Sequence, residues 1–418
     1  MKPFIPILLL LLMLVCPAYA FSGSGSGTAA DPYLISTPAQ FLEIKNDGAK
    51  YYRLTADLDM TGKPWETQVD LGGSSPGFTL DGDGHIVSNL VITSSSGSTP
   101  RYVGMFRKVG SKPVTFKDIV FEDPVVSGSG ALHSNSAYMA LLVANDGGGA
   151  GALTFERVGI VNGTLTQTSG SYSASDQQNG LFVGHTVGNV YFKNCFATGT
   201  ITNTNSNWKM TAGGFVGGFF GSSYKITLED CYVDVAFINP TQKGAFFGGS
   251  VEPTTYGVSL FNSARAPYYD GGSHTHTVIV PCSASEMRDE ETYEYWDIPS
   301  TWRMSTLDSP LGGYPAFSFM TDYLPPPVEP DLQISLTPST SIVGKPLTVT
   351  WEDLPDSDGT DHTVTLHEGE ELIWSRVNAG LSGNYTYTPF VAETYNATYS
   401  CVFDGDNVSV TDTAIVGL

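Results

Sequence analysis

The sequence predicts an all-β protein in two parts, a right-handed parallel β-helix followed by a small β-sandwich. First, a motif of glycine, large apolar residues and glycine returns about every three dozen residues. Second, the runs between its copies have strand lengths and no helical periodicity. Third, polar and apolar residues alternate from residue 331 to the end, between closely spaced turns. The 46 glycines and 12% aromatic residues also favour an all-β chain.

Residues 1–20 have the composition of a secretory signal peptide. One lysine precedes an unbroken apolar run, and the small residues of AYA (18–20) predict cleavage after Ala20. A lipid anchor on Cys16 is the weaker alternative, because Val15 stands where such an anchor needs a small residue. We therefore expect a secreted or cell-surface protein whose mature chain does not insert into a membrane.

The mature chain is strongly acidic. Without the signal peptide it has 19 basic and 42 acidic side chains, a formal charge of −23. Such a surface repels nucleic acid and anionic membranes, so nucleic acid is not an expected partner.

The N-terminal part, residues 21–77, reads as a cap on the β-helix. It contains a strand, a short amphipathic helix that begins after Ser36 or Thr37, and a second strand. A cap is expected because the open end of a β-helix exposes unpaired backbone.

Residues 78–266 hold the repeats, whose first runs carry the glycine motif. Three copies, GLFVG, GGFVG and GAFFG, begin at Gly180, Gly213 and Gly244, and the stretches 102–110 and 138–146 keep step with them. Stacked coils bury faces that a single coil cannot, and glycine is needed where a coil bends sharply. The run MALLVAND (139–146) lacks the paired glycines, which predicts an irregular coil there.

The second runs of the repeats align on apolar anchors. These are separated by 39, 37, 36 and 32 residues and are Phe116, Phe155, Phe192, Leu228 and Leu260. Three positions later the alignment predicts an inward column of Ile119, Val158, Cys195, Cys231 and Ser263. One position before that it predicts a column in a turn or facing outward, namely Asp118, Arg157, Asn194, Asp230 and Asn262.

The remaining boundaries follow from breaks in the pattern. Residues 267–322 interrupt the repeat and are expected to cap the C-terminal end of the β-helix. Residues 323–330, YLPPPVEP, form a stiff proline-rich linker. Residues 331–418 form the sandwich.

The motifs GLFVG, GGFVG and GAFFG, together with the stretches at 26–44, 78–92, 284–304 and 312–319, resemble the GLUG-repeat proteins. The resemblance covers about residues 24–320. It implies a secreted or surface β-helix protein that acts as an adhesin or as a component of a surface structure. The family carries no agreed catalytic motif to transfer.

The C-terminal part is similar to immunoglobulin-like domains. Tyr399, two residues before Cys401, stands where those domains place the tyrosine corner. The second strand, PLTVTW, has no cysteine, so the usual disulfide between the sheets cannot form. Trp351 or Val349 is expected to fill that space.

Cys195 and Cys231 are the candidate disulfide. Residues in register on adjacent coils lie roughly 4.8 Å apart, within reach of a disulfide. Two stacked, reduced core thiols are the favoured alternative. Cys282 and Cys401 have no evident partner.

Catalysis is not expected, although a polysaccharide lyase or glycoside hydrolase remains an alternative for this fold. The outward acids look like a solvated face, and Asp118 and Asp230 are two or more coils apart, too far to cooperate. These acids are Asp118, Glu122, Asp123, Glu229, Asp230 and Asp234.

No cofactor or metal is expected. The runs DGDGH (81–85) and DSDGTD (356–361) mimic the start of calcium loops but lack the distal glutamate, so we interpret them as tight turns, with structural calcium as the weaker alternative. His274 and His276, with Asp270, form a weak candidate for a transition metal.

Four asparagines stand in N-x-Ser/Thr sequons and are candidate glycosylation sites: Asn162, Asn384, Asn396 and Asn407. Aromatic residues in the variable loops, Tyr172, Trp208 and Tyr256, could stack on sugars or serve in inert turns. We expect adhesion to an extracellular glycan or surface. The alternative is a structural subunit of an extracellular filament or coat, whose partners are copies of itself and other surface proteins.

Overall fold

The structure is a computed structural model that describes the chain from residue 21 onward. The described ranges are 21–46, 50–66, 69–71, 77–93, 102–110, 112–129, 136–146, 152–169, 176–204, 209–219, 225–248, 254–256, 258–265, 279–325, 332–353, 360–403 and 406–418. The expected signal peptide lies outside them, as does most of the expected linker. The chain divides into two compact units, Met1–Leu324 and Pro325–Leu418, and each is described by itself.

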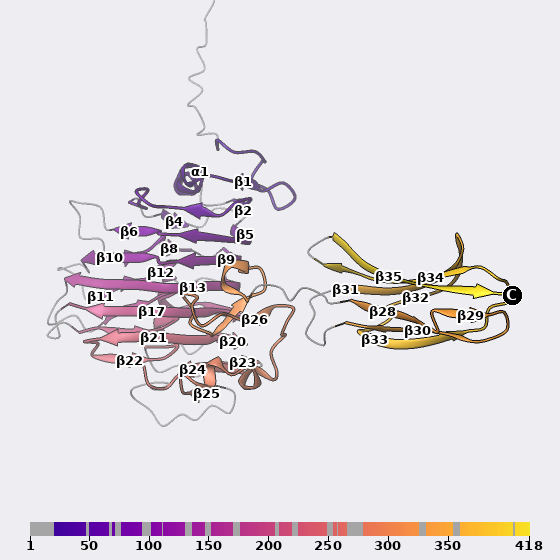
Figure 1. Ribbon diagram of the computed structural model, residues 1–418. Helices are drawn as coiled ribbons and strands as arrows, with labels where there is room; N and C mark the ends of the chain where they lie inside the picture. Colours follow the sequence, from indigo (N-terminus) through magenta and orange to yellow (C-terminus); the bar gives the residue numbers. More distant parts are fainter. Residues whose placement is uncertain are drawn as a thin grey trace, which may run out of the picture. The chain divides into compact units, whose positions relative to one another are not determined.

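The first unit is a β-solenoid of three parallel sheets (Figure 1). The main path of the first sheet is β1 (Tyr33–Ile35), β2 (Tyr51–Leu54), β5 (Phe78–Ser88), β9 (Val114–Glu122), β13 (Ala152–Ser169), β17 (Phe196–Asn203), β21 (Tyr232–Ile238), β24 (Ser259–Asn262) and β25 (Ile279–Cys282). Its side strands are β3 (Leu58–Asp59), β6 (Val91–Thr93), β10 (Val125–Ser129), β16 (Asn189–Lys193), β20 (Ile226–Glu229) and β23 (Thr254–Tyr256).

Two smaller parallel sheets complete each coil. The second sheet contains β7 (Tyr102–Val103), β11 (Ser136–Met139), β14 (Asp176–Gly180), β18 (Thr211–Gly213) and β22 (Gln242–Gly244). The third contains β4 (Val69–Leu71), β8 (Phe106–Val109), β12 (Val143–Asp146), β15 (Val183–Thr186) and β19 (Val216–Phe219). The chain returns to the same sheet one coil later, as the sequence repeat predicts.

The predicted stacking of anchors is confirmed for the central coils. Phe116, Phe155 and Phe192 pair in register, and their rings stack 5.5 and 5.0 Å apart with planes 12° and 9° from parallel. Leu228 continues the column. All four side chains are buried, so the repeat produces one continuous core.

The glycine motif lies at the corner between the second and third sheets. Gly180, Gly213 and Gly244 pair in register. Inside the corner, the Phe182 ring is tilted against that of Phe215 and the Phe246 ring meets Phe215 edge to face, with centroids 4.6 and 5.0 Å apart. A Cβ on Gly213 would lie 2.1 Å from the carbonyl oxygen of Val216. Glycine is therefore required by the close approach of the backbone to itself.

The expectation of an irregular coil at 139–146 is wrong. Ala140 and Ala144 take the glycine positions, and both smaller sheets run through the coil in regular register. The irregularity lies one coil earlier: Val103 pairs with Met139 and Phe106 with Val143, so the first of these corners is one residue shorter.

The expected alignment of the last repeat is also wrong. Thr255, not Leu260, is in register with Leu228, and Leu260 pairs with Tyr232. Consequently Ser263 does not continue the cysteine column; the hydroxyl of Ser259 instead accepts the backbone N–H of Cys231 at 3.2 Å. The last coil is shorter than the others. The alignment of apolar anchors predicts Leu260 at this position because Thr255, which occupies it, is polar.

The outward column is a bend with a left-handed backbone. Asp118, Arg157, Asn194 and Asp230 have φ of 52°, 50°, 51° and 50°, so the expected turn is confirmed at these four positions. Among residues with a side chain, asparagine and aspartate adopt this conformation most readily, which explains two aspartates and one asparagine here. The shortened last coil removes Asn262 from the column.

The N-terminal helix α1 (Pro38–Glu43) begins where the sequence predicts. The hydroxyl of Thr37 accepts the N–H of Gln40 as an N-cap, and the 3-10 turn η1 (Ile44–Asn46) follows. Phe41 and Ile44 are buried in the solenoid core.

Residues 283–324, which we call the flank segment, pack along the outside of the first sheet. They include the 3-10 turns η2 (Glu286–Arg288), η3 (Glu290–Tyr293) and η4 (Thr321–Tyr323) and the hairpin β26 (Trp302–Met304) and β27 (Pro315–Phe317). Their aromatic residues cover outward side chains from successive coils. Val120, Phe196, Tyr232 and Leu260 form one register row with Gly159, and Val161 lies two positions further along β13. The segment thus forms a second apolar layer across the coils.

The second unit is a small β-sandwich. A three-stranded sheet contains β28 (Gln333–Thr337), β30 (Leu347–Glu352) and β33 (Ser382–Tyr387). A five-stranded sheet contains β29 (Thr340–Ile342), β35 (Asp406–Gly417), β34 (Thr394–Phe403), β31 (Thr360–Glu368) and β32 (Glu371–Val377). Trp351 and Val349 are buried between the sheets.

In the described ranges of the whole chain, no helix combines the length and apolar character needed to cross a membrane.

Candidate functional site: a groove under the flank segment

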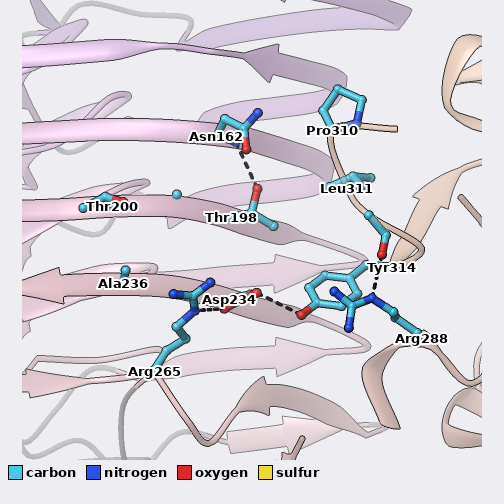
Figure 2. Close-up of a pocket in the computed structure, with 12 residues that line it drawn as sticks. Asn162, Thr198, Thr200, Asp234, Ala236, Arg265, Arg288, Pro310, Leu311 and Tyr314 are labelled. Carbon is cyan, nitrogen blue, oxygen red and sulfur yellow. Dashed lines mark hydrogen bonds and ion pairs between the residues drawn. The ribbon is translucent and has the colours of Figure 1, made fainter. Parts of the chain in front are cut away.

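A groove of about 330 Å³ lies between the first sheet and the flank segment. Figure 2 shows the strands of the solenoid on one side and the turn at 310–314 on the other. The lining residues are Asn162, Thr198, Gly199, Thr200, Asp234, Ala236, Arg265, Arg288, Pro310, Leu311, Gly312 and Tyr314.

The floor of the groove comes from neighbouring coils. Thr198 and Thr200 lie on β17 and Asp234 lies on β21, in the register Thr198↔Asp234. Asn162 lies one coil before Thr198 at a left-handed bend, with φ 53°, and its backbone N–H donates to the hydroxyl of Thr198 at 3.0 Å. The repeat therefore presents a ladder of short polar side chains.

Asp234 is the centre of the polar network. Its Oδ2 accepts the phenol of Tyr314 at 3.0 Å, and its Oδ1 accepts the Nε–H of Arg265 at 2.9 Å and the amide of Asn262 at 3.2 Å. The Asp234 side chain is only 10% exposed, whereas that of Arg265 is 50% exposed. Burial, and secondarily the charge of Asp234, raises the pKa of Tyr314 to about 12, so the phenol stays a donor at neutral pH.

Arg288 supplies a second guanidinium at the rim. It donates from Nε to the carbonyl of Gly312 at 2.7 Å and from Nη1 to that of Ala284 at 2.9 Å. Its carbon Cζ lies 5.2 Å from the centroid of the Tyr314 ring. The groove therefore combines fixed donors, acceptors and one aromatic ring, the groups that bind a polyhydroxylated ligand.

Among the described residues, two that the sequence analysis names line this groove: Asn162, from its sequon, and Asp234, one of the outward acids. Asn162 is exposed. Asn384 and Asn407 are exposed and Asn396 is half-buried, all on the second unit. Glycosylation of the four sequons stays a prediction.

The interpretation of the outward acids as a solvated face is wrong for several of them. Asp118 forms ion pairs with Arg157 and Lys117, and the carboxylate of Glu122 accepts the phenol of Tyr323. Asp118 and Asp230 lie three coils apart at the same bend, about 14 Å at ordinary strand spacing. The structure therefore does not bring these two carboxylates together.

The run DGDGH forms a tight bend inside β5, where the register shifts between Asp81 and His85. Asp83 and Gly84 have φ of 50° and 85°, and the Asp83 N–H donates to Oδ1 of Asp81 at 3.0 Å. Asp81 also pairs with Arg53 at 3.2 Å and Lys117 at 2.8 Å. Structural calcium at this run stays the alternative prediction. The described residues do not include several positions named in the sequence analysis: residues 354–359, Asp270, His274, His276, Tyr172 and Trp208.

Cys195 and Cys231 are free, buried thiols in successive coils. Their Sγ–H groups donate to the carbonyls of Phe155 and Glu229 at 3.3 and 3.2 Å. Burial, and then the neighbouring Cys195, holds the pKa of Cys231 well above its usual range. A disulfide between them stays a prediction.

Sequence reasoning missed the arginines and the tyrosine of the groove. Tyr314 lies in the stretch 312–319, and nothing in the sequence indicates that this stretch folds back over β21. The contact joins residues 80 positions apart.

Comparisons with known proteins give no family for this chain. No protein-family model matches it, and no curated protein matches it. Among solved structures, a crystal structure of an engineered protein is matched at 19% identity and a TM-score of 0.18. The match covers 24% of this chain and 23% of the engineered one.

Proposed function

We propose that this chain is a non-catalytic, exported surface protein of the GLUG type that binds an extracellular glycan in the flank groove. The observation that carries the proposal is the network around Asp234, which holds Arg265 and Tyr314 in fixed positions beside the threonines of β17. The volume of the groove, about 330 Å³, falls at the small end of the usual range for ligand sites, roughly 300–1,000 Å³.

The chemistry of the lining favours a sugar. Hydroxyls of a sugar both donate and accept, and Thr198, Thr200 and Asn162 can do the same. The half-exposed guanidinium of Arg265 favours a ligand that carries a carboxylate or sulfate, because its planar donors match such groups. Acidic glycans are thus the first class to test.

The rest of the proposal rests on the sequence. The signal-like residues 1–20 support export, and the register of Gly180, Gly213 and Gly244 supports the resemblance to GLUG repeats.

The enzymatic alternative needs more than the groove offers. Among the described lining residues Asp234 is the one carboxylate, and three donors already engage it. Glycoside hydrolases generally use two carboxyl groups roughly 5–9.5 Å apart.

A glycan array probed with the mature wild-type protein tests the proposal. Arg265→Ala should abolish the signal on the glycans that bind. Arg107→Ala is the matched control, because Arg107 is 45% exposed and donates its Nε–H to Asp70 at 2.8 Å, away from the groove. An equal loss of glycan binding in Arg265→Ala and Arg107→Ala would count against the groove. So would the absence of any glycan signal with the wild-type protein. Release of new reducing ends from a bound polysaccharide would favour the enzyme instead.

A subunit of an extracellular filament or coat is the second candidate, supported by the surface of the second unit. Leu372 and Val377 are 53% and 67% exposed on β32, an edge strand of the five-stranded sheet. An edge strand with apolar side chains is a template for adding another strand.

The finer assignment of the second unit as immunoglobulin-like has its own support. The sheets group β28, β30 and β33 against the remaining five strands, and Tyr399 donates to the carbonyl of Gly380 at 3.1 Å. Such domains often serve as modules in extracellular assemblies.

Assembly is tested by sedimentation of the purified mature chain over a range of concentrations. The filament candidate requires reversible polymers that Val377→Lys prevents, because a charge on an edge strand blocks pairing. A monomer at every concentration would remove this candidate.

A further inference from the structure

Three side chains able to bind a metal meet in the core of the β-sandwich. One ligand atom each from Asp353, His362 and Cys401 lies within 4.8 Å of the other two. Their residues are 4%, 7% and 2% exposed. This cluster plays no part in the groove.

The strands direct all three side chains inward. Asp353 follows β30 two residues after the buried Trp351, His362 precedes the buried Val364 by two, and Cys401 follows the buried Tyr399 by two. Side chains two positions apart on a strand share a face. The backbone holds them there, since the N–H of Asp353 donates to Leu381 at 2.7 Å and the carbonyl of His362 accepts the N–H of Ala379 at 2.8 Å.

The phenol of Tyr399 contacts the histidine. Its oxygen lies 2.8 Å from Nδ1 of His362 and 3.1 Å from the carbonyl oxygen of Gly380, to which it can donate its one proton. With the proton so placed, Nδ1–H donates to the phenol and Nε2 is the nitrogen left to bind a metal. Nε2 points toward Oδ2 of Asp353, 3.8 Å away. A hydrogen-bonded second nitrogen is the usual support of a metal-binding histidine.

We propose that the sandwich binds one zinc-type divalent cation through Nε2 of His362, Sγ of Cys401 and a carboxylate oxygen of Asp353. Sulfur, imidazole and carboxylate together are a ligand set that zinc accepts. Two such ligands on one tetrahedral zinc lie roughly 3.5 Å apart; in the cluster Nε2 and Oδ2 are 3.8 Å apart, and no pair of ligand atoms exceeds 4.8 Å. On binding, the Cys401 thiol releases its proton to solvent.

The cation would join the two sheets. Asp353 follows a strand of the three-stranded sheet, whereas His362 and Cys401 lie on β31 and β34 of the five-stranded sheet. The sandwich has no second cysteine for a disulfide between the sheets, and metal coordination at this position supplies an equivalent cross-link.

The test uses the full mature chain, reduced, stripped with a chelator and titrated with Zn²⁺ or Co²⁺. We expect one equivalent of zinc per chain, a higher melting temperature for the sandwich, and a thiolate-to-cobalt charge-transfer band. Cys401→Ser and His362→Gln should each weaken binding at least about 100-fold, because loss of an outer partner alone costs about 10–100-fold. Tyr399→Phe should fall in that smaller range.

Two controls keep the assignment specific. Cys282→Ser removes a buried thiol of the first unit, and the double variant His274→Ala/His276→Ala removes the histidine pair of the sequence; neither should change zinc binding. Should Cys401→Ser not fold, the triple variant Cys195→Ser/Cys231→Ser/Cys282→Ser leaves Cys401 alone in the mature chain, and it must keep the charge-transfer band. Sub-stoichiometric zinc, a missing band, or binding that depends on His274 and His276 would overturn the proposal.

Discussion

Tyr314 donates its phenolic hydrogen to Oδ2 of Asp234 across 3.0 Å, although 80 residues separate the two in the sequence. The bond ties the flank segment to the solenoid and fixes the polar centre of the groove. The stability of the first unit and the shape of its proposed ligand site therefore depend on the same contact.

Tyr314→Phe should lower the free energy of unfolding by about 1.5 kcal/mol, the low end for a hydrogen bond to a charged group. The loss stays at the low end because Arg265 and Asn262 still donate to Asp234. Urea unfolding measures it. Tyr295→Phe is the control, since Tyr295 is 73% exposed; an equal loss there would show that the bond contributes nothing specific.

Gly217→Ala should destabilise the solenoid by more than about 3 kcal/mol. Its Cβ would lie 2.2 Å from the backbone nitrogen of Asn179, and backbone cannot move aside as a flexible side chain can. Ala144 occupies the corresponding position two coils earlier, so Ala144→Gly should cost only about 1 kcal/mol. Thermal unfolding of both variants decides; similar costs would contradict the corner geometry.

Asp230→Asn should stabilise the protein at neutral pH. Burial raises the pKa of Asp230 above its ordinary value of 3.8, so its contribution to stability is present at low pH and is lost as pH rises through the folded pKa. Asparagine suits the left-handed bend, as Asn194 shows, and can still accept the N–H of Val258. Urea unfolding across pH measures how much more stable Asp230→Asn is than wild type. This difference in the free energy of unfolding should shrink toward zero below the ordinary pKa of aspartate. A difference that does not depend on pH would contradict the burial of a charged Asp230 as its cause.

The cysteines should not react with a thiol reagent while the protein is folded. Burial raises the pKa of Cys282 to about 11 and that of Cys231 well above its usual range, and the thiolate is the reactive form. Denatured, unreduced mature protein should then show four thiols. A count of two, with Cys195 and Cys231 linked in a peptide map, would establish the disulfide instead.

The parts of the fold that depend on local repetition could be predicted from the sequence. Phe116, Phe155 and Phe192 recur at a nearly constant spacing because each coil repeats the same bend. Thr37 could be predicted as an N-cap because the helix that it caps begins at the next residue. The predicted position of Leu260 in the anchor column is wrong because the last coil is shorter and changes the register. An alignment of apolar residues shows hydrophobicity but not the length of a corner.

The candidate site could be predicted only in fragments. Asn162 was identified from its sequon, but Arg265, Arg288 and Tyr314 reach the groove through a chain reversal that leaves no periodic signal. Similarly, the meeting of Asp353, His362 and Cys401 depends on how two sheets face each other, which no spacing along the chain reveals.

Isothermal titration of the strongest array glycan into wild-type protein, Arg265→Ala and Arg107→Ala tests the central claim most directly. The account predicts that wild type and Arg107→Ala bind with equal affinity and one site per chain, and that Arg265→Ala binds at least about tenfold more weakly, the cost of one hydrogen bond to a charged group. Equal affinities for all three proteins would place the ligand elsewhere and contradict the assignment of the groove.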